Sequence, residues 1–188
     1  LCRFFSGICK HPQEYSSLVE SMVDRLDYDT LSPKEIILVL RVIRPLSSES
    51  KSFKKILEIF STSNFSIVEK LNLIYMLKST NHFRVVQNAK VIDLEQRIVD
   101  DLAALSVADL ESSNVGVTDI SDAMDGFASM KKSTLFVNPK VLNLFTAFLS
   151  TRVTEIKYSP ICGLWQSITD SMGHMRYFDG VWMRSVVE

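Results

Sequence analysis

Apolar residues recur along most of this chain at the spacing of an amphipathic helix. From Phe53 to Phe60, apolar side chains stand at i, i+3, i+4 and i+7, and lysines occupy the opposite side. Comparable patterns predict helices over roughly residues 13–28, 33–45, 50–60 and 67–79, and one long helix or two over residues 83–105. We therefore expect an all-α chain of about eight helices.

Several of these segments begin with a helix-capping signal. Ser32-Pro33-Lys34-Glu35 places a hydroxyl at the N-cap, proline at the first helical position and a glutamate that reaches back to the cap. Ser66-Ile67-Val68-Glu69 predicts a second capping box. Val117-Thr118 and Tyr158-Ser159 repeat the pairing of an apolar residue with a hydroxyl cap, and predict helices that start there.

The four predicted caps indicate an internal repeat. They are Ser32, Ser66, Thr118 and Ser159, separated by 34, 52 and 41 residues. Aligning them brings four residues into one column, Ile37, Leu71, Ala123 and Leu164. A second helix is expected to begin 16 to 19 residues beyond each cap, near Ser50, His82, Val137 and Tyr177.

Repetition at such a period is typical of stacked helical hairpins, because one hairpin cannot cover its own apolar stripe. The pattern predicts a short solenoid of stacked antiparallel helical hairpins over residues 31–188. Residues 1–30 form an N-terminal extension with the first helix, and residues 91–116 hold an insertion of undefined register. The alternative is a chance alignment of short apolar runs.

Composition supports a helical chain without a membrane-spanning segment. Glycine and proline total 11 of 188 residues, roughly half the usual share, which disfavours turn-rich β folds. The longest stretch without a charged residue, Tyr158 to Thr169, has 12 residues, fewer than the roughly 20 that a membrane-spanning helix needs. The odd cysteine count (Cys2, Cys9 and Cys162) favours a reducing or matrix compartment.

Charge is strongly segregated along the chain. Residues 91–129 carry nine acidic side chains and one basic side chain, Arg97, whereas residues 31–90 carry ten basic and four acidic side chains. Such opposed regions suit partners of both signs, or nucleic acid on one surface only. The alternative interpretation is ordinary solvated helix faces.

Residues suited to catalysis or metal binding are scattered. His11, His82 and His174 have no zinc-ligand spacing, and no glycine-rich phosphate loop is present. Cys2, Cys9 and His11 are too loosely placed to predict a metal site, and Cys162 is expected to be a small buried residue. We predict no catalytic residues, no metal, no cofactor and no small-molecule substrate.

Two further groups of residues have a structural and a functional interpretation. Asp119, Asp122 and Asp125 lie near a predicted helix N-terminus, where the helix dipole favours them, and a divalent-cation ladder is the alternative. Trp165 and Trp182 are expected in the core rather than as stacking platforms for bases, since their neighbours are apolar.

The C-terminal third resembles a known family of repeats. The residues concerned are Tyr158-Ser159-Pro160, Leu164-Trp165, Met172-Gly173, Phe178, Trp182 and Val186-Val187. They are similar to the Ser-Pro cap, Leu-Trp core pair and small turn residue of the octotricopeptide repeats and the repeats that precede RAP domains. The resemblance extends loosely over residues 31–188, with Met124 in place of the tryptophan in the preceding unit and no RAP-type ending.

Proteins of this type bind RNA in organelles, and relatives are subunits of mitochondrial ribosomes. The resemblance therefore implies a non-enzymatic scaffold or adaptor subunit of a mitochondrial ribonucleoprotein, in contact with ribosomal RNA and neighbouring protein subunits. Arg3-Phe4-Phe5-Ser6 is similar to the cleavage context of a mitochondrial presequence, which predicts a matrix location.

Basic side chains are the expected contacts to RNA phosphates: Arg41, Arg44, Lys51, Lys54, Lys55, Lys131 and Lys132. The acidic residues 91–129 are the expected contacts to protein neighbours. The alternative function is that of an accessory, protein-binding subunit of a large mitochondrial enzyme complex.

Overall fold

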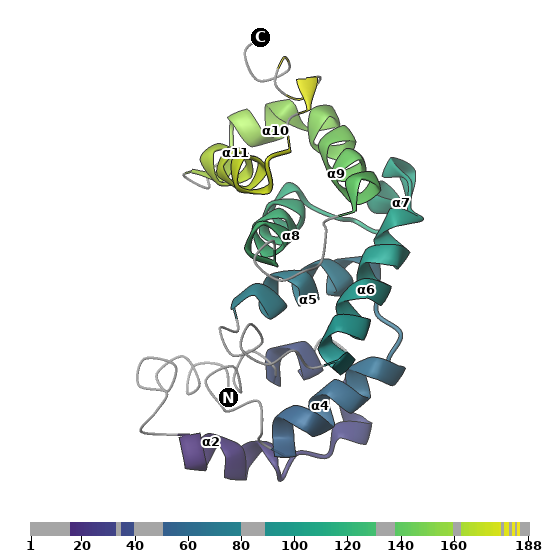
Figure 1. Ribbon diagram of the computed structural model, residues 1–188, viewed down its shortest axis with the longest axis vertical. Coiled ribbons are helices and arrows are strands. Elements are labelled where there is room, and N and C mark those ends of the chain that lie inside the picture. Colours follow the sequence, from purple (N-terminus) through teal and green to yellow (C-terminus); the bar gives the residue numbers. More distant parts are fainter. Residues whose placement is uncertain are drawn as a thin grey trace. The chain divides into compact units, whose positions relative to one another are not determined.

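The computed structural model describes residues 16–32, 35–39, 51–79, 89–130, 138–159, 163–177, 179–180, 182 and 184. These residues form ten helices and no strand, which confirms the all-α class for this part of the chain (Figure 1). The chain divides into two compact units. Unit 1 comprises Leu1–Phe65 and Ser79–Leu94, and unit 2 comprises Ser66–Lys78 and Glu95–Glu188.

The first described helix of unit 1 ends earlier than the apolar spacing predicts. α2 spans Ser16–Val23, and a short 3-10 helix, η1, spans Tyr28–Thr30. The prediction of one helix up to residue 28 is wrong. The Val23 carbonyl instead accepts a hydrogen bond from the Tyr28 hydroxyl (3.0 Å), so that both residues are buried while Asp24 and Arg25 stay exposed.

The first capping box is confirmed. The Glu35 carboxylate accepts hydrogen bonds from the Ser32 main-chain N–H (2.9 Å) and from its hydroxyl (2.7 Å), and residues 35–39 are helical. These bonds lower the pKa of Glu35. The next helix of unit 1, α4, spans Lys51–Thr62, as its periodicity predicts. Ile56 and Phe60 are fully buried, and Phe60 packs against Phe65 at 5.4 Å between ring centroids.

Unit 2 contains most of α5 (Ile67–Ser79), the second half of α6 (Ala89–Ala103) and five later helices. The Ser66 capping box is confirmed, with Glu69 accepting from both the Ser66 N–H and its hydroxyl at 2.9 Å. The later helices are α7 (Val107–Ser112), α8 (Val117–Met130), α9 (Pro139–Thr151), α10 (Val153–Lys157) and α11 (Leu164–Met175).

The region expected as an insertion contains a helix that the periodicity misses. α7 begins with a capping box in which Ser106 binds the Asp109 N–H and Asp109 binds the Ser106 N–H (2.7 Å). The sequence Ser106-x-x-Asp109 carries this signal, since aspartate can replace glutamate at the third position. With α7 and the short α10, the helices outnumber the eight expected.

Two of the predicted caps are wrong. α8 begins at Val117, so Thr118 lies inside the helix, and Asp119 binds the Gly116 N–H (2.9 Å) in place of a hydroxyl cap. α11 begins at Leu164 after Gly163, whose φ of +84° is readily adopted only by glycine. Ser159 is therefore not the cap of α11. The aligned column is nevertheless buried, since an apolar stripe is set by packing and not by the cap: Ile37, Leu71, Ala123 and Leu164.

The core of unit 2 lies among α8, α9 and α11 (Figure 1). Phe127 of α8 and Phe145 of α9 are buried with ring centroids 6.1 Å apart, and Ile168 of α11 is fully buried. α9 begins at Pro139 with Asn138 as its N-cap, close to the predicted start at 137. α8 also approaches α5, because Gly126 leaves room for the Ile74 main chain.

The C-terminal segment is attached to α9 by a polar network. The Tyr177 hydroxyl donates to Asn143 Oδ1 (2.6 Å), and the Thr146 hydroxyl lies 3.1 Å from Asp179 Oδ2. Asp179 Oδ1 accepts a hydrogen bond from the main-chain N–H of Trp182 (3.0 Å). Trp182 is fully buried and stacks on the half-buried Trp165 at 5.1 Å, which supports the predicted core role of Trp182.

Candidate functional site, a polar groove between α8 and α11

A polar groove of about 410 Å³ lies between α8 and α11 in unit 2. Its lining residues are Asp125, Gly163, Gln166, Ser167, Asp170, Ser171 and His174. Five of the seven are exposed, Asp125 is half-buried, and only Ser171 is buried. The groove is thus open along one side.

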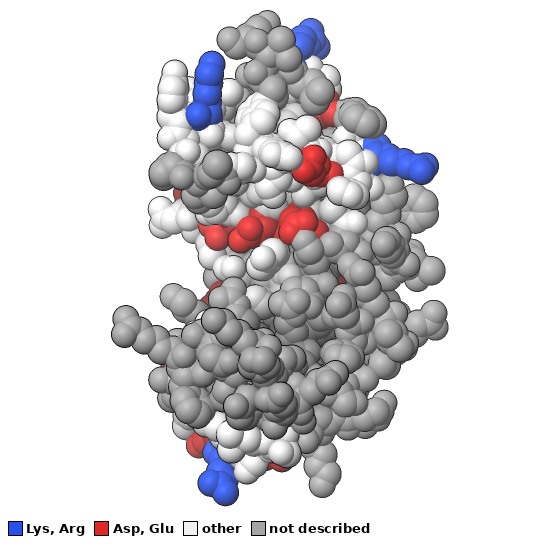
Figure 2. All heavy atoms as spheres, turned by 90° about the vertical axis from the view of Figure 1, so that its left-hand side faces the viewer, with Lys and Arg blue, Asp and Glu red and all other residues white. Residues whose placement is uncertain are grey.

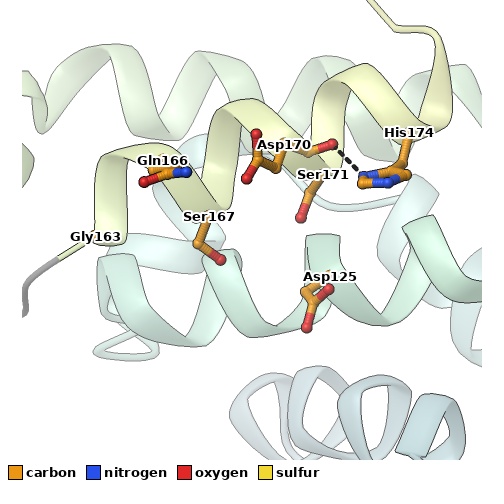
Figure 3. Close-up of a pocket in the computed structure, with 7 residues that line it drawn as sticks. All are labelled: Asp125, Gly163, Gln166, Ser167, Asp170, Ser171 and His174. Atoms are coloured by element: carbon orange, nitrogen blue, oxygen red, sulfur yellow. Dashed lines mark hydrogen bonds between the residues drawn. The ribbon is translucent and has the colours of Figure 1, made fainter.

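Two neighbouring rows of α11 shape the groove. Gly163, Ser167 and Ser171 recur every four residues, and so do Gln166, Asp170 and His174. Residues four apart lie on one face of a helix, so a row of small side chains runs beside a row of longer ones. Figure 3 shows the Ser167 and Ser171 hydroxyls pointing from α11 toward α8, where Asp125 lies across from them. The small row forms the floor, and the longer row forms one rim.

The local fold fixes this arrangement. Gly163 gives the chain the left-handed turn that starts α11, and its carbonyl accepts the Ser167 N–H at 2.8 Å. α11 is held against α8 through the buried Ile168 and Met172. Since these apolar residues fix the rotation of α11, the serines face α8 while Gln166 and Asp170 face solvent.

The groove contains serine, histidine and aspartate, but not in the geometry of a catalytic triad. His174 Nδ1 lies 2.7 Å from the Asp170 main-chain carbonyl oxygen, the hydrogen bond that Figure 3 marks among the lining residues. A carbonyl only accepts, so Nδ1 carries the proton. In a catalytic triad, Nδ1–H donates to a carboxylate, and Nε2 accepts a hydrogen bond from the serine hydroxyl. The described hydrogen bonds of the groove supply neither, and none joins Ser167 or Ser171 to His174.

The groove does not form a metal centre among the described residues. Within that part of the chain, no three His, Cys, Asp or Glu side chains stand close enough to hold an ion. The suggested cation ladder of Asp119, Asp122 and Asp125 is not such a group. Asp119 instead binds the Gly116 N–H at the start of α8, as the structural interpretation of this aspartate predicts.

Acidic side chains are exposed on several helices of unit 2 besides α11. In Figure 2, carboxylates form a row across one face at the level of α8, with few basic side chains beside them. Five acidic residues of unit 2 within residues 91–129 are exposed: Asp100, Asp101, Asp109, Glu111 and Asp122. Lys70 pairs with Asp101 at 2.7 Å, and Arg152 lies 3.7 Å from Glu111.

One acidic group here has a strongly altered pKa. Burial raises the pKa of the half-buried Glu95 to about 7. In contrast, hydrogen bonds from Ser106 lower the pKa of the exposed Asp109. A count of charges along the sequence gives Glu95 and Asp109 the same weight, because such a count does not include burial or hydrogen bonds.

Among the residues predicted to contact RNA, only Lys55 has a described side chain. It is exposed on α4, with its Nζ 4.7 Å from the Tyr28 ring centroid, a cation–π contact. Burial, and then the charge of Asp24, raise the pKa of Tyr28 to about 12. Lys51 and Lys54 lie in the first turn of α4, and their side chains are outside the described part. The remaining four lie entirely outside it: Arg41, Arg44, Lys131 and Lys132.

The cysteines and two of the histidines also lie outside the described residues: Cys2, Cys9, Cys162, His11 and His82. No helix in the described part of the chain is both long and apolar enough to cross a membrane. Comparisons with protein-family models, curated proteins and solved structures find no match to this chain. The fold and the groove define the class, an all-α chain with an acidic polar surface on unit 2.

Proposed function

We propose that this protein is a non-enzymatic scaffold or adaptor subunit of a mitochondrial ribonucleoprotein, with the mitochondrial ribosome as the first assembly to test. Its acidic surface on unit 2 would contact basic segments of neighbouring proteins. The seven basic residues named above would contact RNA phosphates. The protein would bind its partners through complementary shape and charge and would carry out no covalent chemistry.

The exposed carboxylates of unit 2 carry this proposal. Residues 91–129 hold nine acidic side chains and one basic one, and most of these carboxylates reach solvent in the structure. Lys70 and Arg152, which lie outside this segment, pair with Asp101 and Glu111. A one-signed surface of this kind attracts an oppositely charged partner and disfavours other partners.

The arrangement of unit 2 supports the finer proposal of stacked hairpins. α8 and α9 are consecutive helices in contact, and α8 also contacts α11, which belongs to the next predicted hairpin. A solenoid requires this kind of contact from one repeat to the next. The buried column residues Leu71, Ala123 and Leu164 recur in α5, α8 and α11, as a stacked array would require.

Sedimentation of the endogenous protein, with and without ribonuclease, tests the proposed assembly. We expect co-migration with a ribosomal subunit that is lost when the RNA is digested. Binding of purified protein to RNA should also weaken steeply with salt, because phosphate contacts release counterions. Absence of RNA association even at low salt, together with migration as a free protein, would contradict the proposal.

A triple variant tests the acidic surface separately. Asp100→Asn, Glu111→Gln and Asp122→Asn together remove three exposed charges from unit 2 and should weaken co-sedimentation. The matched control neutralises three exposed acids of unit 1, Asp24, Asp27 and Glu58, and should leave it unchanged. Equal effects of both triple variants would show that overall charge, and not this surface, governs assembly.

The second candidate is an accessory subunit of a large mitochondrial enzyme complex that binds protein alone. The Lys55 contact favours it, because this described RNA-contact candidate has its ammonium group over the Tyr28 ring. The same sedimentation experiment distinguishes the two functions. Co-migration with a large complex that survives ribonuclease would support the second candidate over the first.

A further inference from the structure

We infer that residues after α11 form a latch, which opens from α9 and α11 as one unit while these helices stay folded. The described residues of the latch are Tyr177, Asp179, Gly180, Trp182 and Arg184. This inference goes beyond the adaptor function and does not depend on it. It rests on how the latch is attached to α9, how little of it is buried, and how α11 ends.

A single carboxylate both shapes the latch and attaches it. Asp179 Oδ1 accepts a hydrogen bond from the main-chain N–H of Trp182 (3.0 Å), and residues 180, 182 and 184 are helical. Asp179 is thus the N-cap of these helical residues. Its other oxygen, Oδ2, accepts a hydrogen bond from the buried Thr146 hydroxyl of α9 (3.1 Å). Capping and attachment share one side chain, so we expect them to be lost together.

The bonds to α9 break without leaving a buried polar group of α9 unpaired. The Thr146 hydroxyl also lies 3.1 Å from the carbonyl oxygens of Leu142 and Asn143 in its own helix, so it has another acceptor once Asp179 moves away. The second bond joins the Tyr177 hydroxyl to Asn143 Oδ1 (2.6 Å), at an exposed position where water replaces it. The polar attachment is therefore readily reversible.

The apolar attachment of the latch is a single ring among its described residues. Trp182 is fully buried and stacks on Trp165 of α11 at 5.1 Å between ring centroids. In contrast, α8, α9 and α11 each contribute fully buried side chains to the core of unit 2, such as Phe127, Phe145 and Ile168. Segments with few buried apolar contacts open at lower free energy than the core. The latch should therefore open before the core.

The end of α11 is closed by its own main chain. The Arg176 N–H bonds to the Gly173 carbonyl (3.0 Å), and the Tyr177 N–H bonds to the Met172 carbonyl (3.1 Å). Arg176 takes the left-handed conformation (φ +51°) between them. These features define a Schellman motif, which satisfies the last carbonyl groups of a helix. Opening of the latch therefore leaves the last turn of α11 intact.

Tryptophan fluorescence reports the latch directly. Trp165 and Trp182, the two tryptophans of the chain, stack on each other in this contact. In a urea titration of the full 188-residue chain, we expect their emission to shift to the red at lower urea than the loss of amide protection in α8 and α9. Hydrogen exchange followed by mass spectrometry measures that protection at each urea concentration.

Two variants should loosen the latch alone. Thr146→Val removes the hydroxyl that Asp179 accepts and keeps the shape of the side chain. It should raise exchange of residues 179–184 about fivefold, the scale of one hydrogen bond, and leave exchange in α8 unchanged. Tyr177→Phe removes the bond to Asn143 and should act in the same direction.

Thr151→Val is the matched control in α9. The Thr151 hydroxyl bonds to the Phe148 carbonyl within the same helix (2.7 Å), so its removal should leave exchange of residues 179–184 unchanged. An equal effect of Thr151→Val and Thr146→Val would overturn the inference.

Three further outcomes would also overturn it. The first is that emission and α8 protection change at the same urea concentration. The second is that Thr146→Val raises exchange equally in α8 and in residues 179–184, and the third is that neither latch variant changes exchange there. If Thr146→Val does not fold, Tyr177→Phe carries the same test, because its hydroxyl lies outside the core of α9.

Discussion

At Gly126, α8 packs closely against Ile74 of α5. A Cβ atom built there would lie 2.8 Å from Ile74 Cγ2, 2.9 Å from the Ile74 carbonyl oxygen and 3.0 Å from the Ile74 carbonyl carbon. Two of these three atoms belong to the main chain of α5 and cannot rotate away. Alanine at this position therefore forces α5 and α8 apart.

Two opposing terms set the size of the effect of Gly126→Ala. Alanine gains about 1 kcal/mol of helix propensity over glycine. Overpacking of a buried site costs roughly 1–3 kcal/mol, and the upper part of that range applies because the collision is with main-chain atoms. We expect a net loss of about 1–2 kcal/mol in the free energy of unfolding.

Gly173→Ala is the matched control. Gly173 is an exposed residue of α11, and a Cβ there would meet no atom within 4 Å. The same substitution should therefore gain about 0.5–1 kcal/mol from propensity alone. Urea unfolding followed by circular dichroism measures both variants, whose midpoints should move in opposite directions. A Gly126→Ala chain as stable as the native chain, or more stable, would refute the close approach of α8 to α5.

Three other substitutions have outcomes set by local contacts. Glu95→Gln should raise the free energy of unfolding at about pH 8 by on the order of 1 kcal/mol. It should change little at about pH 5. The reason is that the pKa of Glu95 is higher in the folded than in the unfolded chain, so the native protein loses stability as the pH rises from the unfolded-state pKa toward about 7. Urea midpoints at the two pH values check this, and an equal gain at both would contradict it. Asp179→Ala removes the acceptor of the main-chain N–H of Trp182 and should cost about 1–2 kcal/mol, with a red shift of tryptophan fluorescence. Unchanged fluorescence and an unchanged urea midpoint would count against the network. Ser106→Ala should cost about 1 kcal/mol and bring the pKa of Asp109 up toward its ordinary value, which an NMR titration would detect. A pKa that stays low in this variant would mean that another contact holds it there.

Local signals in the sequence predicted most helix positions correctly. The capping boxes at Ser32 and Ser66 form as expected because their partners stand three residues apart, so the geometry of one helical turn suffices to join them. Two failures have a cause in the contacts or backbone around the helix end. α2 ends at Val23 because the carbonyl of that residue bonds to Tyr28, and α11 starts late because Gly163 takes a left-handed turn.

The sequence by itself determined the helical class, the apolar column and the acidic character of residues 91–129, since all three depend on residue type and on spacings within a few turns. Only the tertiary structure decided which surfaces meet. Ser167 and Ser171 form a groove with Asp125 because the buried Ile168 and Met172 set the rotation of α11 against α8. Asn143 and Tyr177 bond across 34 residues of chain. Such pairings depend on how whole helices pack, and no short-range pattern of residues specifies that packing.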